Sequence, residues 1–197
     1  MTLLAGRVEA LDTETTGMSP ATGHALVEVA RVRLENGEIA GYWSSLVNPG
    51  RAIPSDAAAV HGITDTMVAT APTPAAIAPE FREGCGDSMV VLHNAPFDLP
   101  FLSAFLRGAG VRPLWNPVVD TLGLARGLFG PGSNSLGALA VRFSLPAEKA
   151  HRALGDALTT SRLFVLLADR WEREKGIRSL AELAAVSQDV VRTTGRR

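Results

Sequence analysis

The stretch RVEALDTETTG, residues 7–17, decides how the rest of the chain is interpreted. Apolar and polar residues alternate from Arg7 to Asp12, which predicts a β-strand, and the Thr- and Gly-rich segment through Gly17 to Gly23 predicts the turn that follows. Side chains two residues apart in a strand point to the same side. We therefore expect Asp12 and Glu14 to share one face at the carboxyl end of this strand.

More strands follow outward from this stretch. Ala25 to Leu34 and Ile39 to Val47 are rich in β-branched and aromatic residues, and Asn36-Gly37 between them is the pair that a tight type I′ hairpin favours. These segments predict an antiparallel meander of three strands. Two short buried strands are expected later, from Met89 to Leu92 and from Val118 to Asp120.

Helices are predicted between and after these strands. Ala-rich pieces cover Ser55 to Val60, ended by Gly62, and Pro74 to Glu83, ended by Gly84 and Gly86. The order βββαβαβα predicts one α/β domain over residues 1–192, with a mixed sheet of about five strands flanked by helices and a disordered tail at 193–197. The other expected helices are one that Asn94 caps and Pro96 begins, three at 122–129, 136–143 and 154–175, and an amphipathic stretch at 179–191 that packs on the domain.

Composition limits what the protein can be. A chain of 197 residues that is 46% hydrophobic can bury the core of one ordinary domain. The net charge of −1 gives no bulk attraction to a polyanion, so any contact with nucleic acid has to be local. The single cysteine, Cys85, fits a reducing compartment and reads as an inert core thiol. The start of the chain lacks a secretory signal and no apolar run reaches bilayer length, so we expect a cytoplasmic protein without membrane contact.

Four carboxylates and one histidine stand out in three short runs. Taken singly, each residue fits an ordinary structural role: the first two acids could serve the Thr-Gly turn, the other two could be first-turn helix acids, and the histidine could be a loop residue. Collected in apolar segments at the ends of predicted elements, however, they would repel one another unless divalent cations held them. The residues are Asp12 and Glu14 in LDTETTG, Asp98 in HNAPFD, and His151 and Asp156 in HRALGDA.

Together with VHGIT at Val60 to Thr64, these three runs resemble the motifs of the DEDDh family of DnaQ-like 3′-to-5′ exonucleases, which includes the proofreading epsilon subunit of bacterial DNA polymerase III. The resemblance extends from about Leu11 to beyond Asp156, and no catalytic position is substituted. It implies an RNase H-like fold, two Mg²⁺ or Mn²⁺ ions, and release of nucleoside 5′-monophosphates from the 3′ end of single-stranded or 3′-terminal nucleic acid, with DNA favoured over RNA. It also implies a DNA polymerase as a candidate partner.

The resemblance further assigns roles. Asp12 would bridge both ions, Glu14 and Asp156 would hold the ion that binds the attacking water, Asp98 would hold the other ion, and His151 would be the general base. The alternative is a catalytically silent domain that binds nucleic-acid ends or acts as a scaffold for a polymerase.

Substrate contacts are less visible in the sequence. Thr15 and Thr16 could present backbone or hydroxyl groups to the terminal nucleotide, and the family resemblance places His61 in the same pocket, although His61-Gly62 also reads as a helix end. Asn94 could touch substrate, with a helix cap as the favoured role. Phe97 and Phe101 have helical spacing that favours core packing over base stacking.

Overall fold

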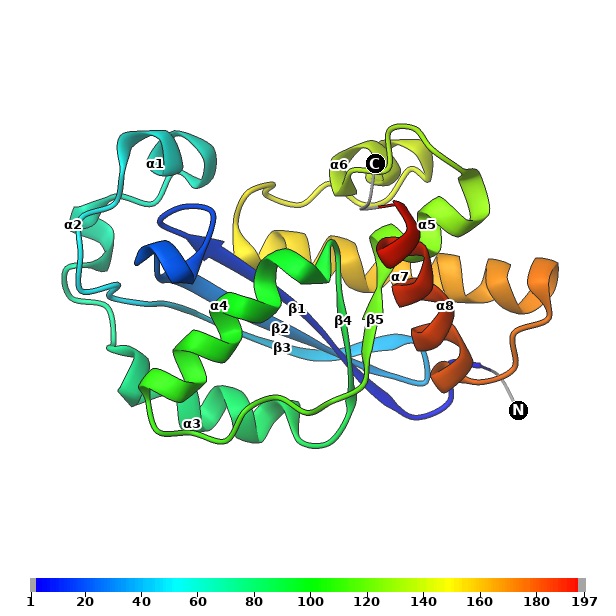
Figure 1. Ribbon diagram of the computed structural model, residues 1–197, viewed down its shortest axis with the longest axis horizontal. Helices are drawn as coiled ribbons and strands as arrows, with labels where there is room; N and C mark the ends of the chain where they lie inside the picture. Colours follow the sequence, from blue (N-terminus) through cyan, green and yellow to red (C-terminus); the bar gives the residue numbers. More distant parts are fainter. Residues whose placement is uncertain (1–2, 195–197) are drawn as a thin grey trace.

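A five-stranded mixed sheet with the order β3-β2-β1-β4-β5 forms the centre of the molecule in the computed structural model, which describes residues 3–194 (Figure 1). β1 pairs antiparallel with β2 and parallel with β4, and β3 and β5 are the edge strands. The predicted fold class is confirmed. The strands are β1 Arg7–Thr15, β2 Leu26–Glu35, β3 Glu38–Leu46, β4 Met89–Leu92 and β5 Val118–Asp120.

The β2–β3 hairpin has the predicted turn. Asn36 and Gly37 have φ angles of 54° and 85°, and both central residues of a type I′ turn need positive φ. β1, in contrast, continues to Thr15, beyond its predicted end at Asp12. Its antiparallel pairing with β2 persists to Glu14↔Glu28, and this hydrogen-bonded ladder outweighs the turn propensity of the Thr-rich sequence.

Helices cover both faces of the sheet (Figure 1). Ala10 of β1 belongs to the core formed with α7, whereas its neighbour Leu11 belongs to the core formed with α3 and α4. Even-numbered residues of β1 therefore face α7, which is the side on which Asp12 and Glu14 emerge. The helices are 3₁₀ helix η1 Pro20–Thr22, α1 Ser55–His61, α2 Asp65–Val68, α3 Pro74–Cys85, α4 Ala95–Gly108, α5 Thr121–Phe129, α6 Leu136–Arg142, α7 Ala153–Lys175 and α8 Leu180–Thr194.

Two helical details differ from expectation. The short helix α2 has no counterpart among the predicted helices, and α3 does not end at Glu83 but runs through Gly84 to Cys85, with Gly86 at its end. A Cβ on Gly84 would lie 2.2 Å from Cζ of Arg31. The guanidinium of Arg31 thus fills the space that a side chain at position 84 would occupy, and the glycine at the helix end is Gly86.

The C-terminal helix α8 packs on the domain, as predicted. Leu183 is fully buried, and the Ser187 hydroxyl accepts a hydrogen bond of 3.1 Å from the backbone N–H of Asp120 in β5. The helix continues to Thr194, so the start of the predicted tail is helical, and 195–197 lie outside the described residues. Among the helices at residues 3–194, none has the length and apolar character needed to cross a bilayer.

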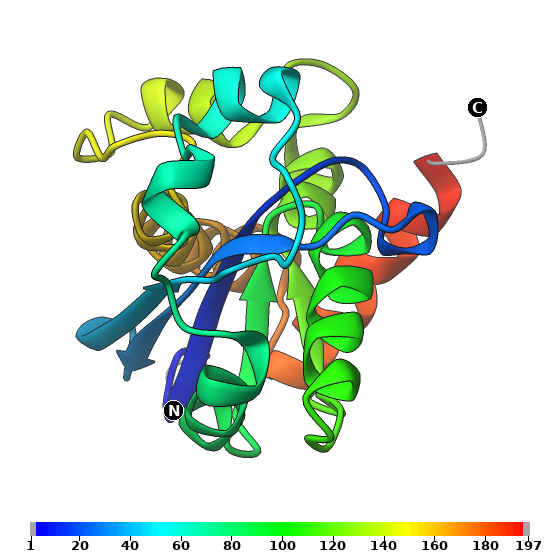
Figure 2. The ribbon, with the colours of Figure 1, turned by 90° about the vertical axis from the view of Figure 1, so that its left-hand side faces the viewer.

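Helices α1 and α6 lie on the same side of the molecule, at the top of both ribbon views (Figure 2).

The buried thiol of Cys85 has its pKa raised to about 12 by burial, which fits an inert core residue. Phe101 is also buried, with Phe97 packed against it at a ring distance of 5.5 Å, so both serve the core.

Candidate active site

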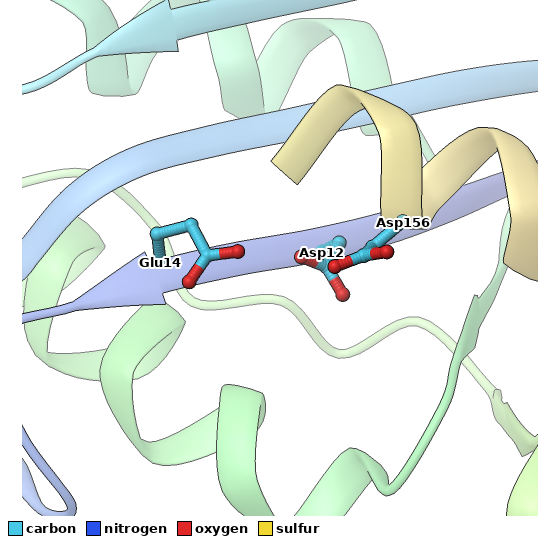
Figure 3. A group of neighbouring side chains, drawn as sticks. All are labelled: Asp12, Glu14 and Asp156. Atoms are coloured by element: carbon cyan, nitrogen blue, oxygen red, sulfur yellow. The ribbon is translucent and has the colours of Figure 1, made fainter. Parts of the chain in front are cut away.

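Three of the predicted carboxylates meet between β1 and α7. Asp12 and Glu14 project from the α7 side of β1, and Asp156 reaches toward Asp12 from the first turn of α7 (Figure 3). Each residue offers a carboxylate oxygen, and these oxygens all lie within 4.8 Å of one another. Segments far apart in the sequence are thus joined in a single acidic cluster.

The start of α7 is built so that Asp156 faces the strand. The backbone at His151 has a φ of 55°, and its N–H donates a 3.0 Å hydrogen bond to Oδ2 of Asp156. This bond orients the carboxylate of Asp156. The imidazole of His151 lies exposed at the rim, where it and Asp156 line a groove of about 470 Å³ that continues along α6.

Electrostatics disfavour full ionisation of this cluster. Burial raises the pKa of Asp12 well above its usual value, and the charges of Asp98, Asp156 and Glu14 raise it further. Burial, followed by the charges of Asp156 and Glu28, raises the pKa of Glu14 to about 8. Burial also raises the pKa of Asp156, and its hydrogen bond from His151 opposes that shift. A divalent cation would relieve this repulsion, and an all-oxygen donor set suits Mg²⁺ or Mn²⁺.

Asp98 approaches from the other face of the sheet. It lies in the first turn of α4, is 4% exposed, and accepts a 2.6 Å hydrogen bond from the hydroxyl of Thr13. Burial raises the pKa of Asp98 to about 7, and the bond from Thr13 lowers it in part. Asp98 is not a member of the three-carboxylate cluster, although its charge is the largest contribution after burial to the raised pKa of Asp12.

A residue that sequence reasoning missed holds the start of α4. The carboxylate of Asp120, at the end of β5, accepts hydrogen bonds from the backbone N–H groups of Asn94 and Ala95, each at 3.0 Å, and from that of Leu122 at 2.9 Å. It therefore caps α4 and α5 together and fixes the turn from which Asp98 projects. The sequence offered one indication of this role, because Asp120 is the last residue of a predicted strand and β5 lies next to β4.

The expected capping by Asn94 is corrected accordingly. Asn94 occupies the N-cap position but has a φ of 68°, and its side chain makes no capping hydrogen bond. A capping side chain reaches the first-turn N–H groups from extended backbone, which Asn94 does not have. Its side chain is instead exposed near the start of α4.

Comparisons with known proteins agree with this arrangement. Residues 10–164 match the model of the RNase T exonuclease family. The chain belongs to the exonuclease family. It is 38% identical over 165 residues to DNA polymerase III subunit epsilon of Rickettsia felis, which covers 80% of this chain and 72% of that protein.

Two further matches are a longer relative and a solved structure. The chain is 45% identical over 163 residues to a DNA polymerase III subunit epsilon-like protein of Rhodobacter capsulatus, covering 79% of this chain but only 23% of that longer relative. Among solved structures, Exonuclease X in complex with 5′-overhanging duplex DNA superposes with a TM-score of 0.73 and 29% identity, covering 91% of this chain and 99% of that one. The resemblance of the three motifs to DnaQ-like exonucleases is thereby confirmed.

The hydroxyls of the two threonines predicted to contact substrate are both engaged in hydrogen bonds within this chain. Both are buried; the hydroxyl of Thr15 donates to the Gly17 carbonyl at 2.7 Å, and that of Thr16 accepts from the Ala25 N–H at 3.0 Å. The Thr16 hydroxyl also lies 3.2 Å from Nδ1 of His24. Their hydroxyls therefore maintain the turn after β1.

His61 occupies the last position of α1, so the helix-end interpretation is confirmed. It is 5% exposed, and its Nδ1 accepts a 3.0 Å hydrogen bond from the Ile63 N–H. Its Nε2 is buried without a hydrogen-bond partner among residues 3–194. Burial lowers the pKa of His61, and an interaction of the ring with the backbone of Thr15 opposes that shift. The charges of Glu28, Arg152 and His151 also act on the pKa, which places the ring beside the start of α7.

Proposed function

We propose that this chain is a 3′-to-5′ exonuclease of the DEDDh type that hydrolyses the terminal phosphodiester bond of DNA and releases nucleoside 5′-monophosphates. The observation that carries the proposal is the meeting of Asp12, Glu14 and Asp156 within 4.8 Å, in a chain of the exonuclease family. The chain spans only 23% of the length of the Rhodobacter capsulatus relative, so the substrate and partner of that protein do not carry over to this chain.

The donor set fits two Mg²⁺ or Mn²⁺ ions. Asp12 would be the ligand that both ions share, because the charges of Asp98, Asp156 and Glu14 all act on its carboxyl group. Glu14 and Asp156 would complete one site, and Asp98 would contribute to the other. When bound, such ions make the phosphorus more electrophilic and neutralise charge on the leaving 3′ oxygen.

His151 would act as the general base. Its ring is exposed at the rim of the groove, while its backbone is fixed by the bond from its N–H to Asp156. The ring therefore remains close to the carboxylates and accessible to water, and an imidazole nitrogen there can take the proton of the attacking water.

For the substrate we propose a DNA 3′ end, supported by the DNA complex of Exonuclease X. The buried Nε2 of His61, which makes no hydrogen bond within the described residues, offers a polar contact beside the start of α7. We also propose association with a DNA polymerase, supported by the names of the epsilon relatives, which size-exclusion chromatography with the cognate polymerase subunit would test.

The decisive experiment uses oligonucleotides labelled at the 3′ or the 5′ end, in DNA and RNA versions, with Mg²⁺, Mn²⁺ or EDTA. The 3′-labelled DNA should yield labelled mononucleotide at once, and the 5′-labelled DNA should give a ladder that shortens with time. Asp12→Asn should lose this activity, whereas the control Asp87→Asn, which changes a fully exposed acid, should retain it. Equal rates for wild type and Asp12→Asn would refute the proposal, and end-binding without turnover would favour the scaffold alternative.

A further inference from the structure

A fifth acid lies against the cluster and has no place in the function described so far. Glu28 on β2 stands directly opposite Glu14 in the β1–β2 register and is 4% exposed. Cross-strand partners point to the same face of a sheet, so its carboxylate is directed toward the three clustered acids. A buried negative charge at this position is unfavourable unless a partner offsets it.

That partner is the start of α7. The guanidinium of Arg152 donates two hydrogen bonds to Glu28, from Nε to Oε2 at 3.0 Å and from an Nη atom to Oε1 at 2.6 Å. The backbone N–H of Ala153, the first residue of α7, donates a third at 2.8 Å to Oε2. Arg152 makes no side-chain cap of its own helix, so Glu28 supplies that cap from a different element.

These contacts hold the segment that carries two of the site residues. Arg152 immediately follows His151 in sequence, and Asp156 lies in the first turn of the helix that Ala153 begins. The loop before the helix is also closely packed, because a Cβ on Gly155 would lie 2.2 Å from the carbonyl oxygen of Lys149. Any movement of α7 away from β2 would therefore shift both Asp156 and His151 relative to Asp12.

We propose that the Glu28–Arg152 pair is a positioning pair, which fixes α7 against β2 and so holds Asp156 at the metal centre and His151 at its rim. The inference rests on the proposed function for its catalytic consequence. Both residues act through others: the Glu28 carboxylate is occupied by three donors, and the Arg152 guanidinium is directed at Glu28 instead of outward to a phosphate.

Two conservative variants test geometry separately from charge. Glu28→Gln preserves shape, but the amide NH₂ cannot accept the second bond from Arg152. Arg152→Lys preserves the positive charge and loses the two-point contact. For each we expect kcat on 3′-labelled DNA to fall about 10- to 100-fold and the Kd for Mn²⁺ to rise about 10- to 100-fold, the usual range for residues that orient metal ligands. KM for DNA should stay within about threefold. Glu28→Gln/Arg152→Met should be no worse than either single variant, because the pair acts as one unit.

Calorimetric titration with Mn²⁺ in the absence of DNA distinguishes the two proposals. If the wild type binds Mn²⁺ but cleaves nothing, the proposed function fails, while weaker Mn²⁺ binding by both variants still supports the positioning role. If both variants bind Mn²⁺ and turn over DNA within about threefold of wild type, the positioning role is refuted. It is also refuted if Arg152→Lys changes only KM, because that result would make Arg152 a substrate contact.

Glu174→Gln, which alters an exposed ion pair further along α7, is the matched control and should resemble wild type. Circular dichroism of each variant establishes that it is folded.

Discussion

Replacing Glu14 by glutamine should make the metal-free protein more stable while it removes a metal ligand. Burial and neighbouring carboxylates raise the pKa of Glu14 from 4.5 to about 8. At pH 7 the folded state therefore holds a proton that the unfolded state has released. The full pKa shift corresponds to roughly 5 kcal/mol of lost stability, of which roughly 3 kcal/mol is lost by pH 7. Because Glu14 is partly exposed, solvent screening reduces this cost, and we expect about 1–3 kcal/mol.

The sign of the pH dependence follows from the direction of the shift. A group whose pKa is higher in the folded state stabilises the fold fully below its unfolded pKa, and this contribution is lost as the pH rises through the folded pKa. For Glu14 the window runs from 4.5 to about 8. The difference between Glu14→Gln and wild type should thus be near zero below the window and largest at its upper end.

The assay is thermal unfolding in EDTA across that pH range, repeated with Mn²⁺. For a chain of this size we expect Glu14→Gln to raise Tm by about 3–10 °C at pH 8 without metal. With Mn²⁺ the order should reverse, because only the wild type retains the complete ligand set. The control Glu38→Gln, at an exposed position on β3, should leave Tm unchanged. If Glu14→Gln is no more stable than wild type in EDTA at pH 8, repulsion among the carboxylates does not destabilise the metal-free fold.

Three other substitutions test separate parts of the structure. Asp120→Asn replaces one acceptor oxygen with an NH₂ donor that faces the N–H at the start of α4. The free energy of unfolding, measured by denaturant titration, should therefore fall by about 1–3 kcal/mol. An unchanged midpoint would contradict the role of Asp120 as the cap of both α4 and α5. Gly123→Ala would place a methyl group 2.0 Å from the carbonyl oxygen of Ser187, and separation of α8 from α5 should lower stability by about 1–3 kcal/mol. A variant as stable as wild type would show that α8 can shift freely. His151→Gln should reduce kcat by about 100-fold or more without changing Mn²⁺ affinity in calorimetry, and full activity would exclude it as the base.

Local patterns predicted most of the elements. Alternation, β-branched residues and the Asn36-Gly37 pair located the strands, because these signals depend on neighbours in the sequence. The motif residues Asp12, Glu14 and Asp156 were found because their chemistry is conspicuous in apolar segments, and the structure brings them together.

Features decided by distant contacts were missed. Gly84 reads as a helix end, yet it lies within α3, where the side chain of Arg31 from β2 packs against it. Asn94 reads as a cap, but a carboxylate from β5 performs that role. Glu28 resembles any polar residue in a strand until its partner, 124 positions away, is known. In each case the deciding partner belongs to another element, and no local pattern encodes it.

The unequal lengths of the strands beside β1 have a consequence for local motion. Pairing of β1 with β4 ends at Ala10↔Val91, whereas pairing with β2 continues to Thr15↔Leu26. The last part of β1, which carries Asp12 and Glu14, is therefore supported by a neighbouring strand on one side only. Its backbone amides should open and exchange with solvent faster than those at Val8 to Ala10, and a cation bound by the carboxylates would slow that exchange by tying the strand end to α7.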